Sequence, residues 1–459
     1  MFPSPDLDKA LLDLRKRGLL QYAGETQRYD MHPIVRHYAY DHFTDEKRRK
    51  EAHVQLAMHF VDAMPVTNKN VKTLEDLAPV IELYHHTVRA GNLDEALDMF
   101  DERLVRPIYF QFGAYQLCIE LLQTLFPDGE DKPPRLKDEN AQGWTLNMLA
   151  NVYSLSGQPR RAVPLYEGDI SISEKRNDKK ETAIGLGNVA TQQLVIGALS
   201  AAERDLRRQI DLCREIESAY GEGNGHAELG RVLFYIASFQ AADDELLSAI
   251  QLFEKIKHTQ YSSVAWSYRA LRFLLMARSN PQSSIVNCKS AIECAQHALE
   301  LADETARDSR FVYPIRDYVR AYWLLGSAYR ANNDLTLAEE NLSKALNLCR
   351  QINLVDTEAD ILLDLARLRY AQGDFKDAQE KASEALTITE RSGYVLQGAD
   401  VNLFLAELAL KGYKSGGLSD KDVAMLHAKE ALKLATCDGP PYYYKVAYEE
   451  AERMLEKLK

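Results

Sequence analysis

The amino-acid sequence predicts an all-α fold, in which helical hairpins stack into a right-handed α-solenoid after a short segment of helix, β-hairpin and helix. The main observation is a pattern of small and aromatic residues that recurs about every 40 residues between Ala141 and Ala435. Composition agrees, because 46% of the residues are hydrophobic and only 15 are prolines. With 459 residues the chain exceeds one ordinary globular core. A solenoid has no such limit, because each unit contacts only its neighbours.

The repeat begins with a leucine or valine followed by a small residue, as in Leu149-Ala150, and continues through Tyr153, Gly157 and Ala162. The small residues of the leading pairs fall at 150, 190, 230, 270, 326, 366 and 406. Five of these six steps are 40 residues and one is 56. Apolar spacing of three and four residues on both sides of a turn indicates a two-helix unit. We expect the small residues to lie where two helices cross closely.

These pairs, with the tyrosines, turn glycines and alanines that follow, resemble the tetratricopeptide-repeat family over about two thirds of the chain. The resemblance implies about seven repeats in 141–440. The family's usual period is about 34 residues, so a period of 40 implies longer helices, as in the repeat arrays of bacterial signal-transduction ATPases. Asn333 stands where the family has a turn glycine.

The first 45 residues have a different pattern. Helices are predicted from Asp6 to Arg17 and from Pro33 to Phe43, with strands at 19–23 and 28–31 around a turn at 24–27. Helix, hairpin and helix in so short a span is similar to the back half of a winged helix, so 1–45 is interpreted as a partial winged-helix element.

The sequence around Met31 and His32 further resembles the winged helix that ends the nucleotide-binding region of STAND (NB-ARC-like) ATPases. The resemblance implies that His32 senses ADP or ATP in a full-length parent, although Pro33 replaces the family's aspartate. The alternative is that His32 caps or packs on the next helix. No Gly-x-x-x-x-Gly-Lys-Ser/Thr motif occurs, and the cluster Gly221–Gly225 has no lysine. We therefore expect no cofactor here and a sequence that begins inside a larger protein.

The remaining segments connect these two regions. Residues 46–140 are predicted to be an irregular helical lead-in that ends after a break at Phe126–Arg135. Interruptions are predicted at 279–284 with 303–314, and at 412–422. Pro440-Pro441 ends the repeats, and 441–459 is predicted to be a capping helix with a charged outer side.

Charge and cysteine usage exclude several classes of partner. The chain has 56 basic and 68 acidic residues, a net charge of −12, which disfavours a general nucleic-acid surface. No apolar run is long enough to span a membrane, and no signal peptide precedes the first helix. The six cysteines, at 118, 213, 288, 294, 349 and 437, form no Cys-x-x-Cys pair. We expect them to be core thiols of a cytoplasmic protein.

No catalytic or metal-binding motif is present. The histidines lack His-Glu-x-x-His spacing, and no Gly-x-Ser-x-Gly elbow occurs. We predict that the chain is not an enzyme and holds no metal.

The concave face of the solenoid is then the candidate site. The resemblance to the tetratricopeptide-repeat family implies that this face is lined by residues near each small anchor on the first helix of a hairpin. These are Trp144, Asn147, Asn151, Arg231, Tyr235, Arg320, Trp323, Arg330, Arg367 and Tyr370, with Ser154, Thr191, Ala227 and Ser327 among them. Amides can hold an extended backbone, guanidiniums can grip a carboxylate, and aromatic residues are usual binding anchors. The alternative is that these residues pack between repeats.

Two functions fit these features. In the first, the repeats are the non-catalytic sensor and autoinhibitory arm of a STAND-type ATPase switch, which bind a protein or peptide and contact an upstream nucleotide-binding domain. In the second, the chain is a free-standing scaffold for protein–protein interaction. Self-association is compatible with either.

Overall fold

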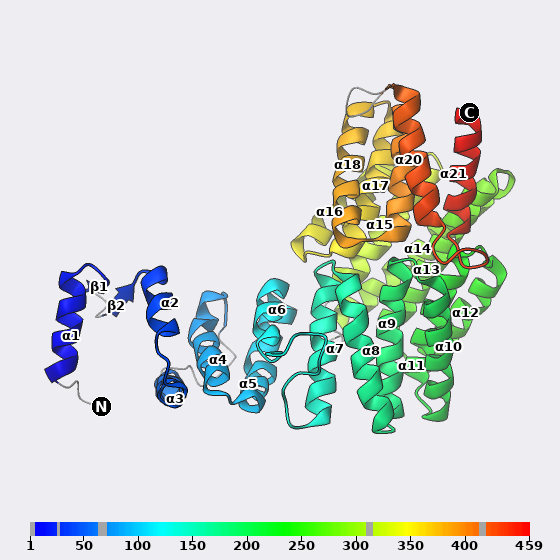
Figure 1. Ribbon diagram of the computed structural model, residues 1–459. Helices are drawn as coiled ribbons and strands as arrows, with labels where there is room; N and C mark the ends of the chain where they lie inside the picture. Colours follow the sequence, from blue (N-terminus) through cyan, green and yellow to red (C-terminus); the bar gives the residue numbers. More distant parts are fainter. Residues whose placement is uncertain (1–4, 25–27, 63–70, 309–314, 413–418) are drawn as a thin grey trace. The chain divides into compact units, whose positions relative to one another are not determined.

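The computed structural model describes residues 5–24, 28–62, 71–308, 315–412 and 419–459 (Figure 1). The chain divides into two compact units, Met1–Arg106 and Pro107–Lys459, here called the N-terminal unit and the repeat unit. The predicted break at 126–135 lies inside the repeat unit, and the domain boundaries drawn from the sequence stay predictions.

The N-terminal unit starts with the predicted helix, hairpin and helix. The elements are α1 (Pro5–Lys16), β1 (Leu20–Ala23), β2 (Arg28–Met31), α2 (Pro33–Asp41) and α3 (Glu46–Asp62). The strands are antiparallel and pair Leu20 with Met31. This confirms the predicted order of elements; part of the expected turn, 25–27, lies outside the described residues. His32 caps α2, because its Nδ1 accepts a hydrogen bond from the Ile34 N–H at 3.3 Å. This is the alternative given above for His32.

Short helices complete this unit: η2 (Glu75–Leu77), α4 (Ala78–Ala90), α5 (Leu93–Met99) and η3 (Phe100–Leu104). Its core contains a chain of polar contacts, in which His53 bonds to the Tyr40 hydroxyl and to His86, each at 3.0 Å. Burial lowers the pKa of both histidines, and neighbouring charges lower that of His53 further. The neutral form of both rings is therefore favoured, and the pair supports the packing of α3 on α4.

The helix η4 (Arg106–Gln111) starts at the last residue of the N-terminal unit. The repeat unit continues with α6 (Tyr115–Gln123) and then becomes regular. The regular helices are α7 (Glu139–Leu155), α8 (Pro159–Lys175), α9 (Lys179–Val195), α10 (Leu199–Glu215), α11 (Ala219–Tyr235) and α12 (Phe239–Lys255). Each has 17 residues, and three residues separate each from the next. The 40-residue period is therefore two equal steps of a helix and a linker, and the all-α hairpin solenoid is confirmed.

The middle residue of each linker adopts the left-handed conformation. These residues are Gly157, Asn177, Gly197, Glu217, Ala237 and Lys257. At the first linker the Gln158 N–H donates to the Tyr153 carbonyl at 2.8 Å, and the Gly157 N–H donates to the Ser154 carbonyl at 3.1 Å. This pairing satisfies carbonyls at the end of a helix and needs a positive φ, which glycine adopts at least cost. Asn333 has a φ of 64° at the equivalent place, so asparagine there preserves the turn.

The small anchors lie at close helix crossings, as predicted. A Cβ atom on Gly230 would lie 2.7 Å from the Leu246 Cγ, and one on Gly326 would lie 2.9 Å from the Leu342 backbone nitrogen. Glycines of the Gly221–Gly225 cluster lie within α11, where a Cβ on Gly223 would meet the Phe253 ring at 2.8 Å. This cluster therefore serves packing.

The second half of the repeat unit is less regular. Its helices are α13 (Thr259–Ser279), η5 (Pro281–Ser283), α14 (Ser284–Arg307), α15 (Ile315–Ala331), α16 (Leu335–Gln351), α17 (Val355–Gln372), α18 (Phe375–Ser392), α19 (Val395–Ala409), α20 (Asp420–Ala435) and α21 (Lys445–Leu458). With 21 and 24 residues, α13 and α14 are four and seven longer than the regular helices.

These longer helices correct one prediction. An interruption was expected at 303–314. This is wrong for residues 303–307, because α14 continues through them and Thr305 is fully buried. Residues 309–314 lie outside the described residues. The second interruption is shorter than expected, because α20 begins at Asp420.

The repeat unit folds back on itself (Figure 1). Leu396, Leu403 and Tyr444 belong to the same buried cluster as Leu199 and Leu233. The Asp438 carboxylate accepts hydrogen bonds from the backbone and side chain of Ser200 at 2.8 and 2.9 Å. Glu449, Glu452 and Arg453 on α21 are exposed, as a charged outer side requires. Its other side packs near the middle of the array, so the inner faces of early and late repeats oppose each other.

Candidate ligand-binding site

Two cavities lie between the first helices of the hairpins in the repeat unit. Cavity 1 has a volume of about 570 Å³ and is lined mainly from η4, α6, α7, α9, α11, α13, α15 and α17, with Tyr166 of α8, Gln351 at the end of α16 and Ile352 after it. Cavity 2 has a volume of about 170 Å³ and is lined from α11, α13, α14, α15, α17 and α19, with Tyr444. Both cavities are therefore formed by residues far apart in the sequence that the fold-back brings together.

Cavity 1 crosses the helices diagonally. Its lining includes Asn151 and Ser154 in the last turns of α7, Asn188 and Gln192 in α9, Asn224, Glu228 and Arg231 in α11, and Gln260 and Tyr268 in the first half of α13. It ends at Arg316, Asp317 and Arg320 in α15 and at Asp356 in the first turn of α17. The lining position thus moves from the end of one helix to the start of another.

Several polar groups of cavity 1 have no partner in the described part of the chain. The side-chain amides of Asn188, Gln192 and Asn224 form no hydrogen bond there. Gln192 is only 8% exposed, yet it lines the cavity. Because these amides line the cavity without a protein partner, the cavity is suited to a molecule that supplies donors and acceptors.

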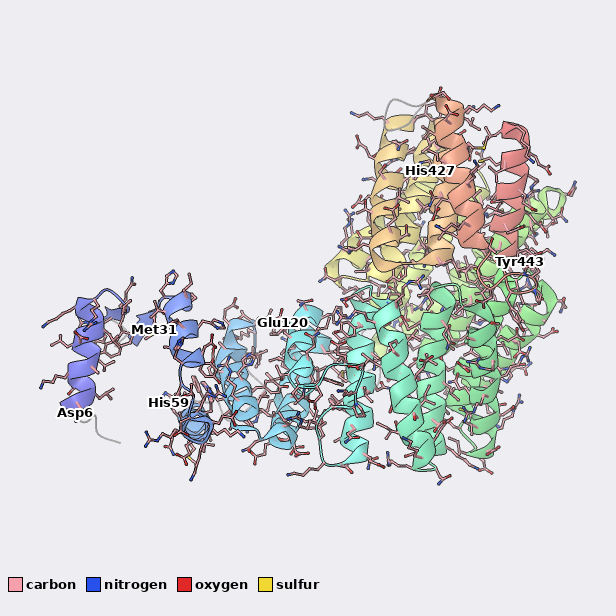
Figure 2. The ribbon with its side chains drawn as sticks, viewed as in Figure 1. Asp6, Met31, His59, Glu120, His427 and Tyr443 are labelled. Carbon is pink, nitrogen blue, oxygen red and sulfur yellow. The ribbon has the colours of Figure 1, made fainter. Side chains whose placement is uncertain are left out.

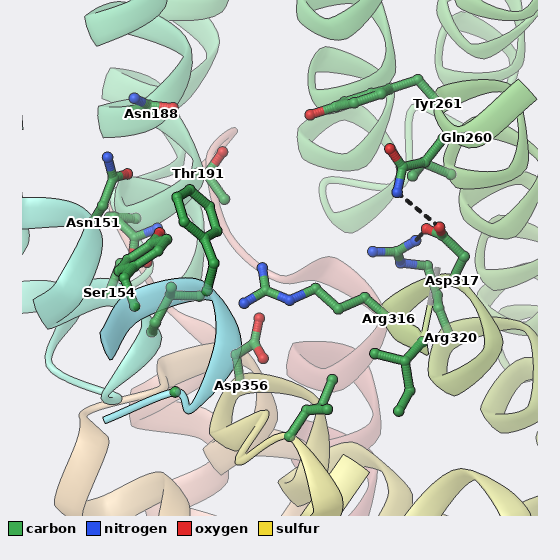
Figure 3. A pocket seen from close by; sticks show the side chains of 18 of the residues that line it. Asn151, Ser154, Asn188, Thr191, Gln260, Tyr261, Arg316, Asp317, Arg320 and Asp356 are labelled. Carbon is green, nitrogen blue, oxygen red and sulfur yellow. Dashed lines mark hydrogen bonds and ion pairs between the residues drawn. The ribbon is translucent and has the colours of Figure 1, made fainter. Parts of the chain in front are cut away.

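Arg316 is the least constrained cation of cavity 1. Its guanidinium extends into the middle of the cavity, between the side that carries Asn151 and Thr191 and the side that carries Gln260 (Figure 3). Among the described residues its one hydrogen bond is a long one, 3.4 Å from Nη2 to the Tyr115 hydroxyl. The five N–H donors of an arginine are therefore largely available here.

The other cations of cavity 1 are paired. Arg231 lies 2.7 Å from Glu228 and stacks on the Tyr268 ring at 4.8 Å. Arg320 lies 3.4 Å from Asp317, to which the Gln260 amide also donates at 3.0 Å (Figure 3). Burial raises the pKa of Asp317 although Arg320 opposes the shift. These pairs shape the wall of the cavity around the freer Arg316.

Cavity 2 is built around Asp364, whose side chain is 8% exposed. Its carboxylate accepts hydrogen bonds from Trp323 Nε1 at 2.9 Å, from the Ser327 hydroxyl, and from Arg330 and Arg367 at 3.2 and 3.3 Å. Burial alone raises the pKa of Asp364, but the two guanidiniums outweigh it and hold that pKa below its usual value. The carboxylate is thus charged and fully used within the protein.

A second ionic group closes the same cavity. Arg278, near the end of α13, lies 2.8 Å from Asp400 on α19 and 2.7 Å from Glu450 on α21. Its Nη1 also donates to the Tyr444 hydroxyl at 3.2 Å. Arg278 therefore connects the middle of the array to its last helices.

The structure separates the predicted site residues into three groups. Asn151, Arg231 and Arg320 line cavity 1, as do Ser154 and Thr191. Tyr235, Trp323, Arg330 and Arg367 line cavity 2, with Ser327. Trp144, Asn147, Ala227 and Tyr370 line neither cavity. Ligand binding by any of these residues stays a prediction.

Two of the residues outside both cavities have clear structural contacts. The Asn147 amide donates to Asp169 at 2.9 Å and its oxygen accepts from Asn151 at 2.8 Å. Tyr370 packs edge-on against Phe375 and Phe404. Packing between helices, the alternative considered from the sequence, accounts for both.

Sequence reasoning missed Arg316, Asn188, Gln192 and Asn224. The prediction took residues at similar distances from each small anchor, but the diagonal course of cavity 1 changes that distance from helix to helix. Arg316 lies ten residues before its anchor, Gly326, in the first turn of α15. The sequence did contain a signal for Arg316, because it lies four residues before Arg320 and so on the same face of the helix.

The described residues give little support for metal binding, for reactive cysteines or for a membrane-spanning helix. They contain no group of His, Cys, Asp and Glu that could hold a metal ion. The described histidines include His427 on α20 (Figure 2), which bonds to Asn402 on α19 at 2.8 Å. The cysteines are unpaired and all but Cys437 are buried, and burial raises the pKa of Cys118 to about 12. None of the described helices combines the length and apolar character needed to cross a membrane.

Comparisons with known proteins support the assignment of helical repeats. Residues 317–391 and 145–180 match the family described as tetratricopeptide repeat. No curated protein matches the sequence. These two segments are therefore tetratricopeptide repeats, and they include helices that line both cavities.

Three solved structures are similar to this chain at low identity. A Pyrococcus horikoshii STAND protein with a tetratricopeptide-repeat sensor shares 18% identity, with a TM-score of 0.40 over 98% of this chain and 60% of that one. A Rap protein complexed with Competence and Sporulation Factor shares 14%, with a TM-score of 0.48 over 84% and 100%. Yeast Tom70 shares 14%, with a TM-score of 0.42 over 90% and 95%. This chain thus spans 60% of the length of the archaeal protein.

Proposed function

We propose that the repeat unit is a non-catalytic binding module that receives a peptide, or an extended segment of a protein, in cavity 1. The observation that carries this proposal is the set of polar groups without partners in that cavity, above all the Gln192 amide and the Arg316 guanidinium. The tetratricopeptide repeats in 145–180 and 317–391 support it as well.

The chemistry of cavity 1 favours an extended backbone that carries a carboxylate. Each side-chain amide offers one acceptor and two donors, which match the C=O and N–H of a peptide unit. Asn188, Gln192 and Asn224 lie on two neighbouring first helices, so they can contact successive peptide units. Arg316 would grip a carboxylate, either of an acidic side chain or of the C-terminus, with two parallel hydrogen bonds.

The finer proposal is that this module is the sensor and autoinhibitory arm of a STAND-type ATPase. It rests on the resemblance of 1–45 to a winged helix and on the helix, hairpin and helix found there. A free-standing scaffold is the alternative. A coding sequence with a P-loop ATPase domain before Met1 would support the switch, and an authentic translation start at Met1 would favour the scaffold.

Selection from a random peptide library against the whole chain tests the binding function. We expect selected peptides to be enriched in acidic residues or a free C-terminal carboxylate. Arg316→Gln should weaken their binding by at least about tenfold, because a hydrogen bond to a charged group is worth about 1.5–3 kcal/mol. The control is Arg391→Gln, which changes an exposed arginine on α18. Unchanged affinity in Arg316→Gln would contradict the proposal.

A further inference from the structure

The ionic groups at cavity 2 include one more carboxylate than guanidinium when Glu450, which pairs with Arg278 from outside the lining, is counted. Three arginines, Arg278, Arg330 and Arg367, are paired there. Asp360, Asp364 and Asp400 line the cavity, and Glu450 lies outside the lining and shares Arg278 with Asp400. Asp364 pairs with two arginines, and Asp400 and Glu450 share Arg278, so Asp360 is the one of these four acids without an arginine partner.

Asp360 has no cationic partner among the described residues. Its one hydrogen bond there is a long one, 3.4 Å from Gln397 Nε2. Burial raises its pKa well above the usual range, and the nearby Asp364 and Asp400 raise it further. Asp360 is half-buried and lies near two other carboxylates, so its charged form is disfavoured, which favours keeping a proton or taking up a cation.

The rest of the cavity determines which cation fits. Leu271, Leu274, Leu275 and Leu363 give it an apolar wall, and Tyr235, Trp323 and Tyr444 add aromatic surface. A chain of methylene groups gains by burial against leucines, and an ammonium is attracted to aromatic rings. A metal ion fits poorly, because the described residues contain no metal-binding group of His, Cys, Asp and Glu.

We propose that cavity 2 is a second binding site, separate from cavity 1, that takes a primary alkylammonium group with Asp360 as its counter-ion. The volume of about 170 Å³ accommodates a short alkyl chain with its ammonium. The same chemistry is offered by a free amine and by a lysine side chain. Asp360 is two turns before Arg367 on α17, so the site lies within the ionic network that holds the late repeats together.

Calorimetric titration of the whole chain with n-butylammonium tests this site. The controls are n-butanol, which has the same shape without charge, and potassium ion, which has charge without the alkyl chain. Asp360→Asn should weaken binding of n-butylammonium by at least about tenfold, as expected for the loss of a charged hydrogen bond. Asp211→Asn, at an exposed position on α10, should leave the affinity unchanged.

A parallel titration with Nα-acetyl-lysine methylamide separates the two sources. Tighter binding of this compound assigns the ammonium to a lysine side chain, and tighter binding of n-butylammonium assigns it to a small amine. The proposal is overturned if neither binds, if n-butanol binds equally well, or if Asp360→Asn retains full affinity. The n-butanol and potassium titrations use the unmodified chain, so they decide the matter even if Asp360→Asn does not fold.

Discussion

Cavities 1 and 2 are built from the inner sides of the same set of helices, yet their polar residues are used differently. In cavity 1, Arg316 has a single long hydrogen bond among the described residues, and three amides have none. In cavity 2, Arg330 and Arg367 share Asp364, which also accepts from Trp323 and Ser327. An arginine on an inner face is thus either available, as Arg316 is for the ligand proposed above, or engaged in holding the array together, and its partners distinguish the two cases.

This comparison changes the choice of residues for mutagenesis. From the sequence, Arg231, Arg330 and Arg367 were equivalent candidates for ligand contacts. In the structure each is within 3.3 Å of a carboxylate and at most 23% of each side chain is exposed. Reversing their charge would disrupt the fold as well as any binding, so Arg316 is the more informative position.

The largest effect is expected at the centre of cavity 2. Asp364→Ala leaves Arg330 and Arg367 without their shared carboxylate, and removing one partner of a buried ion pair costs about 3–5 kcal/mol. The free energy of unfolding in urea should fall by this amount. Asp211→Ala, at an exposed carboxylate, should change it by less than about 0.5 kcal/mol. A loss below about 1 kcal/mol for Asp364→Ala would mean that the network adds little stability.

A smaller effect, of opposite sign, is expected at Asp169. Burial raises the pKa of Asp169 to about 6, despite the hydrogen bond from Asn147. Because this folded-state pKa is above the unfolded one, the native state binds the proton more tightly, and ionisation of Asp169 costs stability as pH rises from about 4 to about 6. Asp169→Asn should therefore stabilise the protein at pH 7 by about 1–3 kcal/mol and have little effect at pH 4.

The measurement is urea unfolding of both proteins across this pH range. The difference in unfolding free energy between variant and wild type should grow as pH rises through about 6. An equal difference at pH 4 and pH 7 would show that the Asp169 carboxyl titrates normally. The expected sign is the reverse of that for Asp364, whose pKa the arginines lower.

The smallest effects are expected in the linkers. There, glycine and other residues adopt the same left-handed backbone conformation, so their costs can be compared. Glu217 has a φ of 55°, and Gly373 has a φ of 82° with space for a Cβ atom. Glu217→Gly should stabilise the protein by about 0.5–1 kcal/mol, because it relieves backbone strain and removes a negative charge at a helix C-terminus. Gly373→Ala should destabilise it by about 1 kcal/mol. Thermal unfolding of both variants would test this, and equal shifts of one sign would contradict it.

Much of the fold could be predicted from the sequence, because the relevant signals are local. The 40-residue period follows from apolar spacing within each hairpin, and the small anchors follow from helix crossings such as that of Gly326 with Leu342. The strands at 20–23 and 28–31 and the cap at His32 are also local. Each of these features depends on neighbours in the chain or in the adjacent helix.

The features that could not be predicted depend on how repeats accumulate along the array. The contact of Ser200 with Asp438 follows from the small rotation between successive hairpins, which no single repeat encodes. The same rotation carries cavity 1 diagonally from Asn151 to Arg316. Residues chosen by their distance from an anchor therefore fell partly in cavity 1, partly in cavity 2, and partly in neither.

The most direct test compares Arg316→Gln with Arg367→Gln in two measurements on the same samples. One is the affinity for a peptide selected against the unmodified chain, and the other is the free energy of unfolding in urea. The predicted result is that Arg316→Gln loses at least about tenfold in affinity with little loss of stability, because a charged hydrogen bond to the ligand is removed. Arg367→Gln should lose stability and keep its affinity. The opposite assignment, with affinity lost in Arg367→Gln and stability lost in Arg316→Gln, would contradict the roles given to the two cavities.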